Sequence, residues 1–117
     1  MEVSELAGRS LDWAVKQCEL LGGHITMGEY NGKPAVILNN GLLYCDEEWF
    51  CPSVNWSQGG PIIEREKITP HADFEEWVAQ AWQSNVTESG DTLLVAAMRC
   101  YVSLKAGDSI EIPEELC

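Results

Sequence analysis

The sequence predicts an α+β fold in which an antiparallel sheet packs with an N-terminal helix and a central C-terminal helix. Its 117 residues, 45% of them hydrophobic, suffice for one modest core, so we expect a single domain over residues 1–117. The elements follow in the order helix, hairpin, long loop, strand and helix, which is typical of helices packed on an antiparallel sheet. We expect that sheet to contain the hairpin plus one or two further strands.

The first helix is predicted from Ser10 to Leu21. Apolar side chains recur there at helical spacing, and Gly22 with Gly23 supplies a C-terminal stop. The apolar stripe consists of Leu11, Ala14, Val15, Cys18 and Leu21. We expect this stripe to face the core.

The other faces of this helix carry charges and two large apolar residues. We expect Asp12, Lys16 and Glu19 to form a solvated, charge-paired flank. Trp13 and Leu20 lie opposite the stripe. Either a second element covers them, or Trp13 faces a pocket or a partner subunit, so homodimerisation stays open.

A β-hairpin should follow the first helix. The stretch from His24 to Tyr30 alternates as a strand does, and Asn31-Gly32 is a strong turn signal before Ala35 to Leu38. Pro34 is confined to an edge or a strand start, which limits pairing near the start of the second strand. Leu42 to Tyr44 forms a short third strand or leads into a loop.

The stretch from Cys45 to Pro61 is the segment that we expect to carry a function. It combines proline, paired glycines and three aromatic residues, and no single period runs through it. A polar loop of this length is uncommon in a compact domain unless it has a task. Gly59-Gly60 lets a backbone approach a ligand closely, and Pro61 suits the first position of a short helical turn over Ile62 to Glu66.

The C-terminal half supplies one ambiguous element and one clear helix. Phe74 to Trp82 fits either a helical stripe or a strand, and we favour a strand. After a polar connection from Ser84 to Gly90, Asp91 or Thr92 can cap a helix over Leu93 to Leu104. Because this helix is apolar nearly all round, it should be central.

Charge and cysteine usage exclude several function classes. Seven Lys and Arg against nineteen Asp and Glu give a net charge of -12, which repels nucleic acid and anionic membranes. The sequence has no apolar run long enough for a membrane span and no signal-peptide pattern, so we expect a cytoplasmic protein. Five cysteines without an export signal favour free thiols over disulfides, and their spacing does not suit zinc. We therefore expect no metal and no cofactor.

An enzyme is the weaker hypothesis, because the motifs of common hydrolases and nucleotide-binding enzymes are absent. The carboxylate run from Asp46 to Glu48 is more simply a solvated acidic turn than a metal site. His71 and Asp73 form an acid/base pair on paper, but the fold must supply every remaining group. We assign no catalytic residue.

Basic residues are sparse, so each one is informative. Arg99 is the only charged side chain between Asp91 and Lys105, in a helix predicted to be buried. It pairs with an acid, extends its head to the surface, or binds a ligand carboxylate or phosphate through its planar donor fork. Arg65 with Lys67, after the Gly-Gly-Pro turn, is the other cationic candidate.

Three stretches resemble a known family. They are Leu11 to Val15, Trp56 to Glu66 with its Trp-x-x-Gly-Gly-Pro segment, and Ala96 to Val102 followed by Lys105 and Gly107. Together they resemble the NinX-like family of small tailed-phage and prophage proteins, a domain of unknown function. The resemblance implies a phage accessory protein in the bacterial cytoplasm. By analogy, such small acidic proteins occupy a host protein or a small signalling molecule of host immunity.

The leading functional hypothesis is a non-enzymatic, anti-defence protein that captures a small anionic, nucleotide-like molecule. Aromatic side chains would stack on a base, and Arg65 and Arg99 would bind phosphates. The candidate ligand-binding residues are Trp13, Trp49, Trp56, Ser57, Gln58, Gly59, Gly60, Arg65, Arg99 and Tyr101. Two rival hypotheses are an acidic inhibitor that mimics nucleic acid or docks on a basic host factor, and an enzyme acting on a small metabolite.

Overall fold

The computed structural model describes residues 1–38, 43–44 and 50–116. Within them the chain forms the α-helices α1 (Gly8–Leu21), α2 (Trp56–Glu66) and α3 (Leu93–Ala106). One antiparallel sheet contains β1 (Ile25–Tyr30), β2 (Lys33–Leu38) and β3 (Leu43–Tyr44). A second contains β4 (Thr69–Asp73), β5 (Glu76–Gln80) and β6 (Thr87–Gly90). Short 3-10 helices, η1 (Val3–Glu5) and η3 (Glu114–Leu116), lie near the termini.

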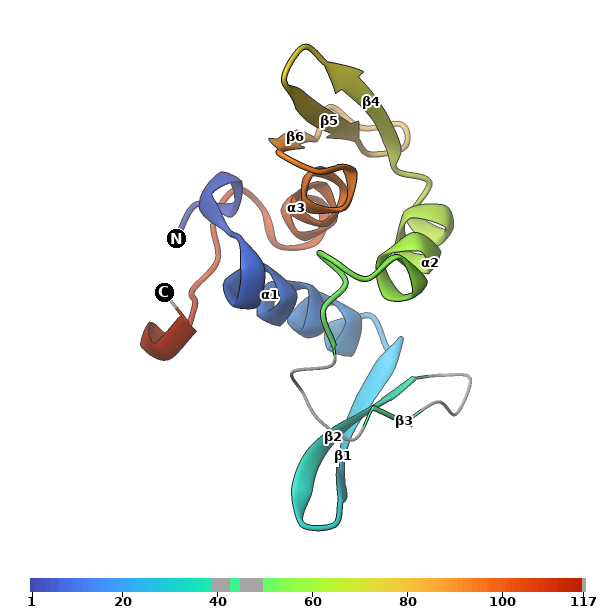
Figure 1. The fold of residues 1–117 in the computed structure, drawn as a ribbon, viewed down its shortest axis with the longest axis vertical. Coiled ribbons are helices and arrows are strands. Elements are labelled where there is room, and N and C mark those ends of the chain that lie inside the picture. The colour runs from blue at the N-terminus through green and yellow to red at the C-terminus, as the bar shows by residue number, and fades with distance from the viewer. Residues whose placement is uncertain (39–42, 45–49, 117) are drawn as a thin grey trace.

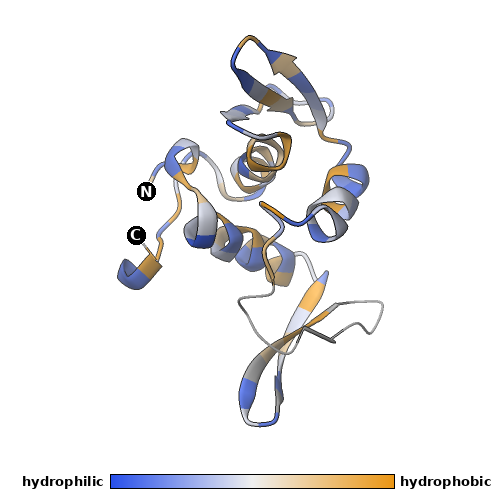
Figure 2. Ribbon diagram, viewed as in Figure 1, coloured by the Kyte–Doolittle hydropathy of each residue, from blue (hydrophilic) through white to orange (hydrophobic). Residues whose placement is uncertain are grey.

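Helix α3 lies at the centre of the molecule, as its nearly continuous apolar sequence predicts (Figure 1). It packs against the β4–β6 sheet on one side and contacts α1 and α2 on others. Figure 2 shows it as one of the more hydrophobic segments of the ribbon. Its buried residues are Leu94, Ala96, Ala97, Met98, Cys100, Tyr101, Val102 and Ser103. The predicted α+β class with a central C-terminal helix is confirmed.

The strands form two sheets, whereas the sequence predicted one. The stretch from Phe74 to Trp82 supplies β5, so the preference for a strand is confirmed. The polar connection expected from Ser84 to Gly90 contains β6, and β4 was not predicted at all. Both strands lack a continuous apolar face, and β4 also contains Pro70, so neither shows the alternation that marks a half-buried strand. Strand β5 brings them into a sheet by pairing with each.

Helix α1 begins two residues before the predicted start at Ser10, and its apolar stripe is buried except at the last residue. The stripe residues Leu11, Ala14, Val15 and Cys18 are buried, but Leu21 is 90% exposed, so its placement in the stripe was wrong. The helix ends there because Gly23 takes a φ of +75° and the N–H of His24 donates to the carbonyl of Glu19 (2.9 Å). The chain turns away at this point, and Leu21 stays outside the core.

The charged flank of α1 is not solvated, so that prediction is wrong. Glu19 is 4% exposed, Lys16 is also buried, and Asp12 is half-buried. Asp12 Oδ1 accepts a hydrogen bond from the N–H of Ser53 (2.9 Å). Burial raises the pKa of the Asp12 carboxyl, although the bonds from Ser53 oppose this. Segments distant in sequence cover this flank, and helical spacing alone does not reveal them.

The β1–β2 hairpin confirms its prediction. Asn31 and Gly32 have φ values of 53° and 78°, the two positive angles that a type I′ turn requires. Strand β3 pairs with β2 at Val36 and Ile37, so the third strand is present and lies beyond Pro34 in the ladder. This arrangement agrees with the limit that proline sets on the start of β2.

Helix α2 replaces the second half of the predicted loop. It begins at Trp56, well before the helical turn expected at Ile62 to Glu66, and Pro61 lies inside it instead of at its first position. Those two predictions are wrong. The Asn55 side chain caps the helix by accepting a hydrogen bond from the N–H of Ser57 (2.9 Å). Glycines weaken an isolated helix, so tertiary packing must supply much of the stability of α2.

Candidate functional site

The three helices meet at a network of charged and hydroxyl side chains. Tyr101 of α3 is fully buried, and its hydroxyl donates to Glu19 Oε2 of α1 (2.6 Å). Arg65 of α2 donates to the same carboxylate from Nη1 (3.3 Å) and Nη2 (2.5 Å). One buried carboxylate thus joins all three helices. Two of the predicted ligand-binding residues, Arg65 and Tyr101, are used to hold the helices together.

The network continues to a second carboxylate. Glu66 accepts a hydrogen bond from Arg65 Nε (2.9 Å) and pairs with Lys105 of α3 (3.0 Å). Burial opposes charge on Arg65 and Glu66, but their bonds outweigh it, so the pKa of Arg65 is raised and that of Glu66 is lowered. Burial and the bond to Glu19 raise the pKa of Tyr101 far above its usual range. The network therefore contains two negative and two positive side chains, whose charges cancel.

Arg99 is bonded to the backbone. Its Nε donates to the carbonyl of Leu6 (2.8 Å), and its Nη1 donates to the carbonyl of Ser89 in β6 (2.8 Å). The guanidinium therefore ties the segment before α1 to the second sheet. An acid is one of the three partners that the sequence leaves open for Arg99, and these hydrogen bonds go to carbonyl oxygens instead. These bonds occupy two of the donors that a phosphate would need.

Three of the candidate residues at the start of α2 have structural partners. Gln58 Oε1 accepts a hydrogen bond from the N–H of Cys51 (2.6 Å), and Ser57 donates from its N–H and hydroxyl to the Asn55 side chain. A Cβ on Gly59 would lie 2.5 Å from the carbonyl oxygen of Pro52 and 2.7 Å from Leu94 Cδ2. Close packing within the protein explains glycine at 59. A Cβ on Gly60 would meet no atom within 4 Å.

The tryptophans do not gather at one described site. Trp13 is half-buried and packs against the core. Trp56, the first residue of α2, is 56% exposed. Among the described residues, no hydrogen bond, ion pair or ring contact joins Trp13, Trp56 and Arg99. Trp49 lies outside the described residues, as does the carboxylate run from Asp46 to Glu48.

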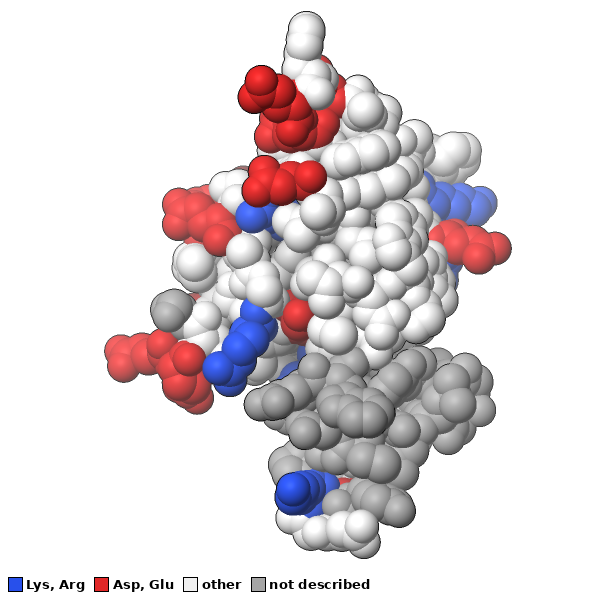
Figure 3. All heavy atoms as spheres, viewed as in Figure 1, with Lys and Arg blue, Asp and Glu red and all other residues white. Residues whose placement is uncertain are grey.

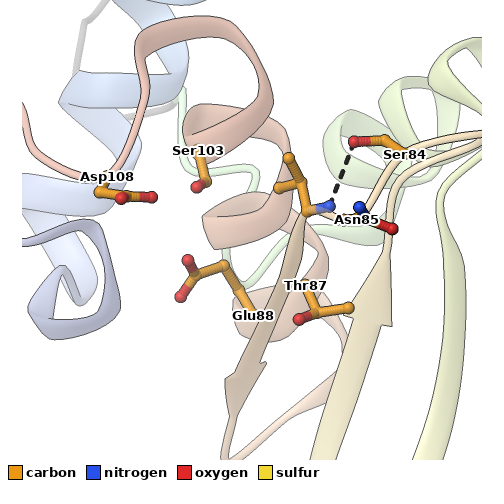
Figure 4. A pocket seen from close by; sticks show the side chains of 7 residues that line it. Ser84, Asn85, Thr87, Glu88, Ser103 and Asp108 are labelled. Carbon is orange, nitrogen blue, oxygen red and sulfur yellow. Dashed lines mark hydrogen bonds between the residues drawn. The ribbon is translucent and has the colours of Figure 1, made fainter.

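A polar hollow of about 450 Å³ lies where the end of α3 meets β6. Its lining comes from Ser84, Asn85, Val86, Thr87, Glu88, Ser103 and Asp108. Figure 4 shows Glu88 of β6 and Ser103 of α3 beside this hollow, with Asp108 across it, while the Ser84 hydroxyl accepts a bond from the N–H of Val86 (3.1 Å). Burial, with Asp108 and Glu2 nearby, raises the pKa of Glu88 despite the opposing effects of Ser103 and Arg99. The two carboxylates make this hollow unsuited to an anion.

Most acidic side chains outside the network are exposed. In Figure 3 they lie around the periphery of the described part, over the β4–β6 sheet, near the N-terminus and at the C-terminal tail. The exposed acids are Glu2, Glu5, Glu29, Glu64, Asp73, Glu75, Glu76, Asp91, Asp108, Glu111, Glu114 and Glu115. The exposed basic residues are only Arg9, Lys33, Arg65, Lys67 and Lys105, so the described surface is negative on balance.

Two exposed aromatic residues lie at opposite ends of β5. Trp82 is 56% exposed, and Lys67 Nζ lies 5.2 Å from the centroid of its ring, a cation–π distance. Phe74 is fully exposed in the turn between β4 and β5. Neither residue was predicted to have a function. No feature of the sequence indicates that Phe74 lies in an exposed turn, because large aromatic residues are not typical of turns.

Sequence reasoning also missed the ion network to which Arg65 belongs. Glu19, Glu66 and Lys105 lie on three helices, whereas charge pairing read along one helix joins residues three or four apart. A signal was available at Glu19, because this acid lies four residues after Val15 of the buried stripe and so at the edge of that stripe.

Within the described residues, no helix combines the length and apolar character that crossing a membrane requires, and no group of three or more His, Cys, Asp or Glu is arranged to hold a metal ion. Comparison with curated proteins gives no match. The family model described as Bacteriophage P22, NinX matches residues 2–105, which is most of the chain. The three stretches that suggested this relationship lie within or next to that range, and the chain belongs to the phage NinX family.

Proposed function

We propose that this NinX-family chain is a non-catalytic binding protein that docks through its acidic surface on a basic protein of the bacterial host. The observation that carries the proposal is the unequal use of the two kinds of charge. Twelve acids of the described part are exposed, against five basic residues, and two of those five, Arg65 and Lys105, are paired with acids of the chain. A surface of this kind accelerates association with a basic partner and rejects acidic ones.

The alternative is capture of a small nucleotide-like anion, which the sequence favoured. The exposed Trp56 supports it, because an indole ring can stack on a base. Phosphate binding, however, requires Arg65 to leave Glu19. Separating a buried ion pair costs about 3–5 kcal/mol, and the cost here is lower because the Arg65 side chain is 32% exposed. The two carboxylates beside the polar hollow also disfavour an anion there. We therefore propose protein docking ahead of nucleotide capture.

The experiment compares both candidates on the full chain. Tagged protein is incubated with lysate of a bacterial host at about 50 mM and about 500 mM NaCl, and retained proteins are identified by mass spectrometry. In parallel, calorimetry and thermal shift measure binding of ATP, GTP and cyclic dinucleotides. We expect a specific basic protein that is retained at low salt and released at high salt, with no nucleotide binding. Nucleotide binding without a salt-sensitive partner would reverse the order of the two candidates.

A further inference from the structure

The turn between β4 and β5 presents one phenyl ring fully to water. Asp73 pairs with Glu76 at the end of the ladder, so Phe74 and Glu75 form a two-residue turn. Phe74 is the most exposed of the large hydrophobic side chains in the described part of the chain. Its ring therefore adds nothing to the hydrophobic core, which is where a small domain usually places an aromatic side chain.

The backbone at Phe74 is also strained. Its φ is +51°, in the left-handed region, at the first position of a two-residue turn where glycine is the usual residue. The β1–β2 turn meets a similar requirement with Asn31 and Gly32, the residue types that tolerate it. A bulky side chain at positive φ is uncommon. Phe74 therefore lowers the stability of the fold, and strain of this kind is a reason to look for a function.

We propose that Phe74 is the anchor by which the chain docks, inserting its ring into an apolar pocket on a protein partner whose pocket rim carries Lys or Arg. This inference rests on the proposed function and deepens it by naming the contact. Asp73, Glu75 and Glu76 are exposed around the ring and face the basic rim. The acids increase the association rate, and the buried ring slows dissociation.

The charges around the ring decide between this partner and other occupants of the turn. An anionic membrane surface repels Asp73, Glu75 and Glu76, and so does the phosphate backbone of a nucleic acid. A second copy of the chain, related by a two-fold axis through this turn, brings the same acids against each other. A basic protein surface with an apolar pocket is complementary to both the ring and its acidic rim.

Photo-crosslinking provides the first test. A photoreactive phenylalanine analogue replaces Phe74 in the full chain, and a control chain carries it in place of Leu21, which is 90% exposed on a different element. Both chains are irradiated in the host lysate at low salt. We expect the analogue at 74 to crosslink to the protein that high salt releases from the unmodified chain. The analogue at 21 should not crosslink to it.

Affinity for that protein, identified and purified, provides the second test. We expect Phe74→Ala to weaken binding roughly 10- to 100-fold, mainly through faster dissociation. Phe74→Trp should keep most of the affinity, and Leu21→Ala should not change it. Phe74→Gly should abolish anchoring while its melting temperature stays equal or rises, because glycine relieves the positive φ. Loss of binding in that variant cannot be attributed to unfolding.

The possible outcomes distinguish failure of the Phe74 anchor from failure of the proposed function. If a salt-sensitive basic partner binds Phe74→Ala as tightly as the unmodified chain, the anchor is overturned and the proposed function stands. If nucleotides bind and no such partner is retained, the proposed function fails together with the anchor. If the purified chain is a dimer that Phe74→Ala converts to a monomer, a second copy occupies the turn and the basic partner is overturned.

Discussion

Two neighbouring glycines in α2 provide a matched test of how this helix packs. Gly59→Ala and Gly60→Ala make the same chemical change in the same helix. A Cβ at 59 would lie 2.5 Å from the carbonyl oxygen of Pro52 and 2.7 Å from Leu94 Cδ2, whereas a Cβ at 60 would meet no atom within 4 Å. The two variants therefore share the gain in helix propensity and differ in the steric conflict.

The expected magnitudes have opposite signs. Replacing Gly by Ala inside a helix stabilises by about 0.8–1.0 kcal/mol. Because a side chain before Pro61 disfavours the helical backbone, Gly60→Ala should raise the free energy of unfolding by at most about 1 kcal/mol. Overpacking costs about 1–3 kcal/mol. At position 59 the upper end applies, because the closer contact is with a backbone oxygen that cannot rotate away. Gly59→Ala should then lower the free energy of unfolding by about 2 kcal/mol, after the same propensity gain is included.

Urea and thermal unfolding, followed by far-UV circular dichroism, measure both effects. A change of 1 kcal/mol shifts the melting temperature of a chain of this size by about 3–5 °C. Gly60→Ala should therefore melt above the unmodified chain and Gly59→Ala well below it. The dependence of unfolding free energy on urea should be unchanged in both, since neither substitution alters the surface exposed on unfolding.

Equal stabilisation of both variants would refute the packing of Gly59 against Pro52 and Leu94. A loss of stability in Gly60→Ala as large as that in Gly59→Ala would refute the open surface at position 60. Loss of stability in both, without loss of helical signal, would indicate that residues 56–60 form a loop, as the sequence first suggested. The pair thus tests whether residues 56–60 form a helix or a loop.

Three further predictions concern buried polar groups. Tyr101→Phe should lower the free energy of unfolding by about 1.5–3 kcal/mol in urea titrations, because it removes a hydrogen bond to the charged Glu19. Arg99→Lys should cost about 1–2 kcal/mol in the same assay, since one ammonium cannot reproduce the planar fork that reaches two carbonyls. Burial raises the pKa of Cys18 and of Cys100 from 9.0 to about 11. Because the buried thiols stay protonated where unfolded thiols ionise, the free energy of unfolding should fall between pH 9 and 11 and show no such fall below pH 9. Cys18→Ala and Cys100→Ala variants should each show a smaller fall over this range.

The sequence predicted the elements whose signals are local. The turn at Asn31-Gly32, the stop at Gly22-Gly23 and the cap at Thr92 each depend on a few adjacent residues, and all three are present. The central position of α3 was also predicted, because a helix that is apolar nearly all round has no face suited to water. In these places local preference and tertiary structure agree.

Prediction was wrong where distant segments decide the outcome. Residues 56–61 have weak helix formers at Gly59 and Gly60, yet packing against Pro52 and Leu94 holds them in a helix. Glu19 has the pattern of a solvated flank, yet Arg65 and Tyr101 bury it. A single sequence does not identify partners this far apart, since periodicity reports one element at a time.

The stretches that suggested the family explain the architecture better than the activity. Gly59 packs on Leu94, and Arg65 and Lys105 meet Glu66 and Tyr101 where α2 joins α3. Residues that pair within a partly buried ion network are poorly suited to bind a ligand. To bind it they must leave their partners, and each partner is then left as an unpaired charge. A binding surface that leaves the fold intact must therefore avoid the residues of this network. Phe74 meets that condition, since removing its ring takes nothing from the core, and this is why its substitution separates binding from folding.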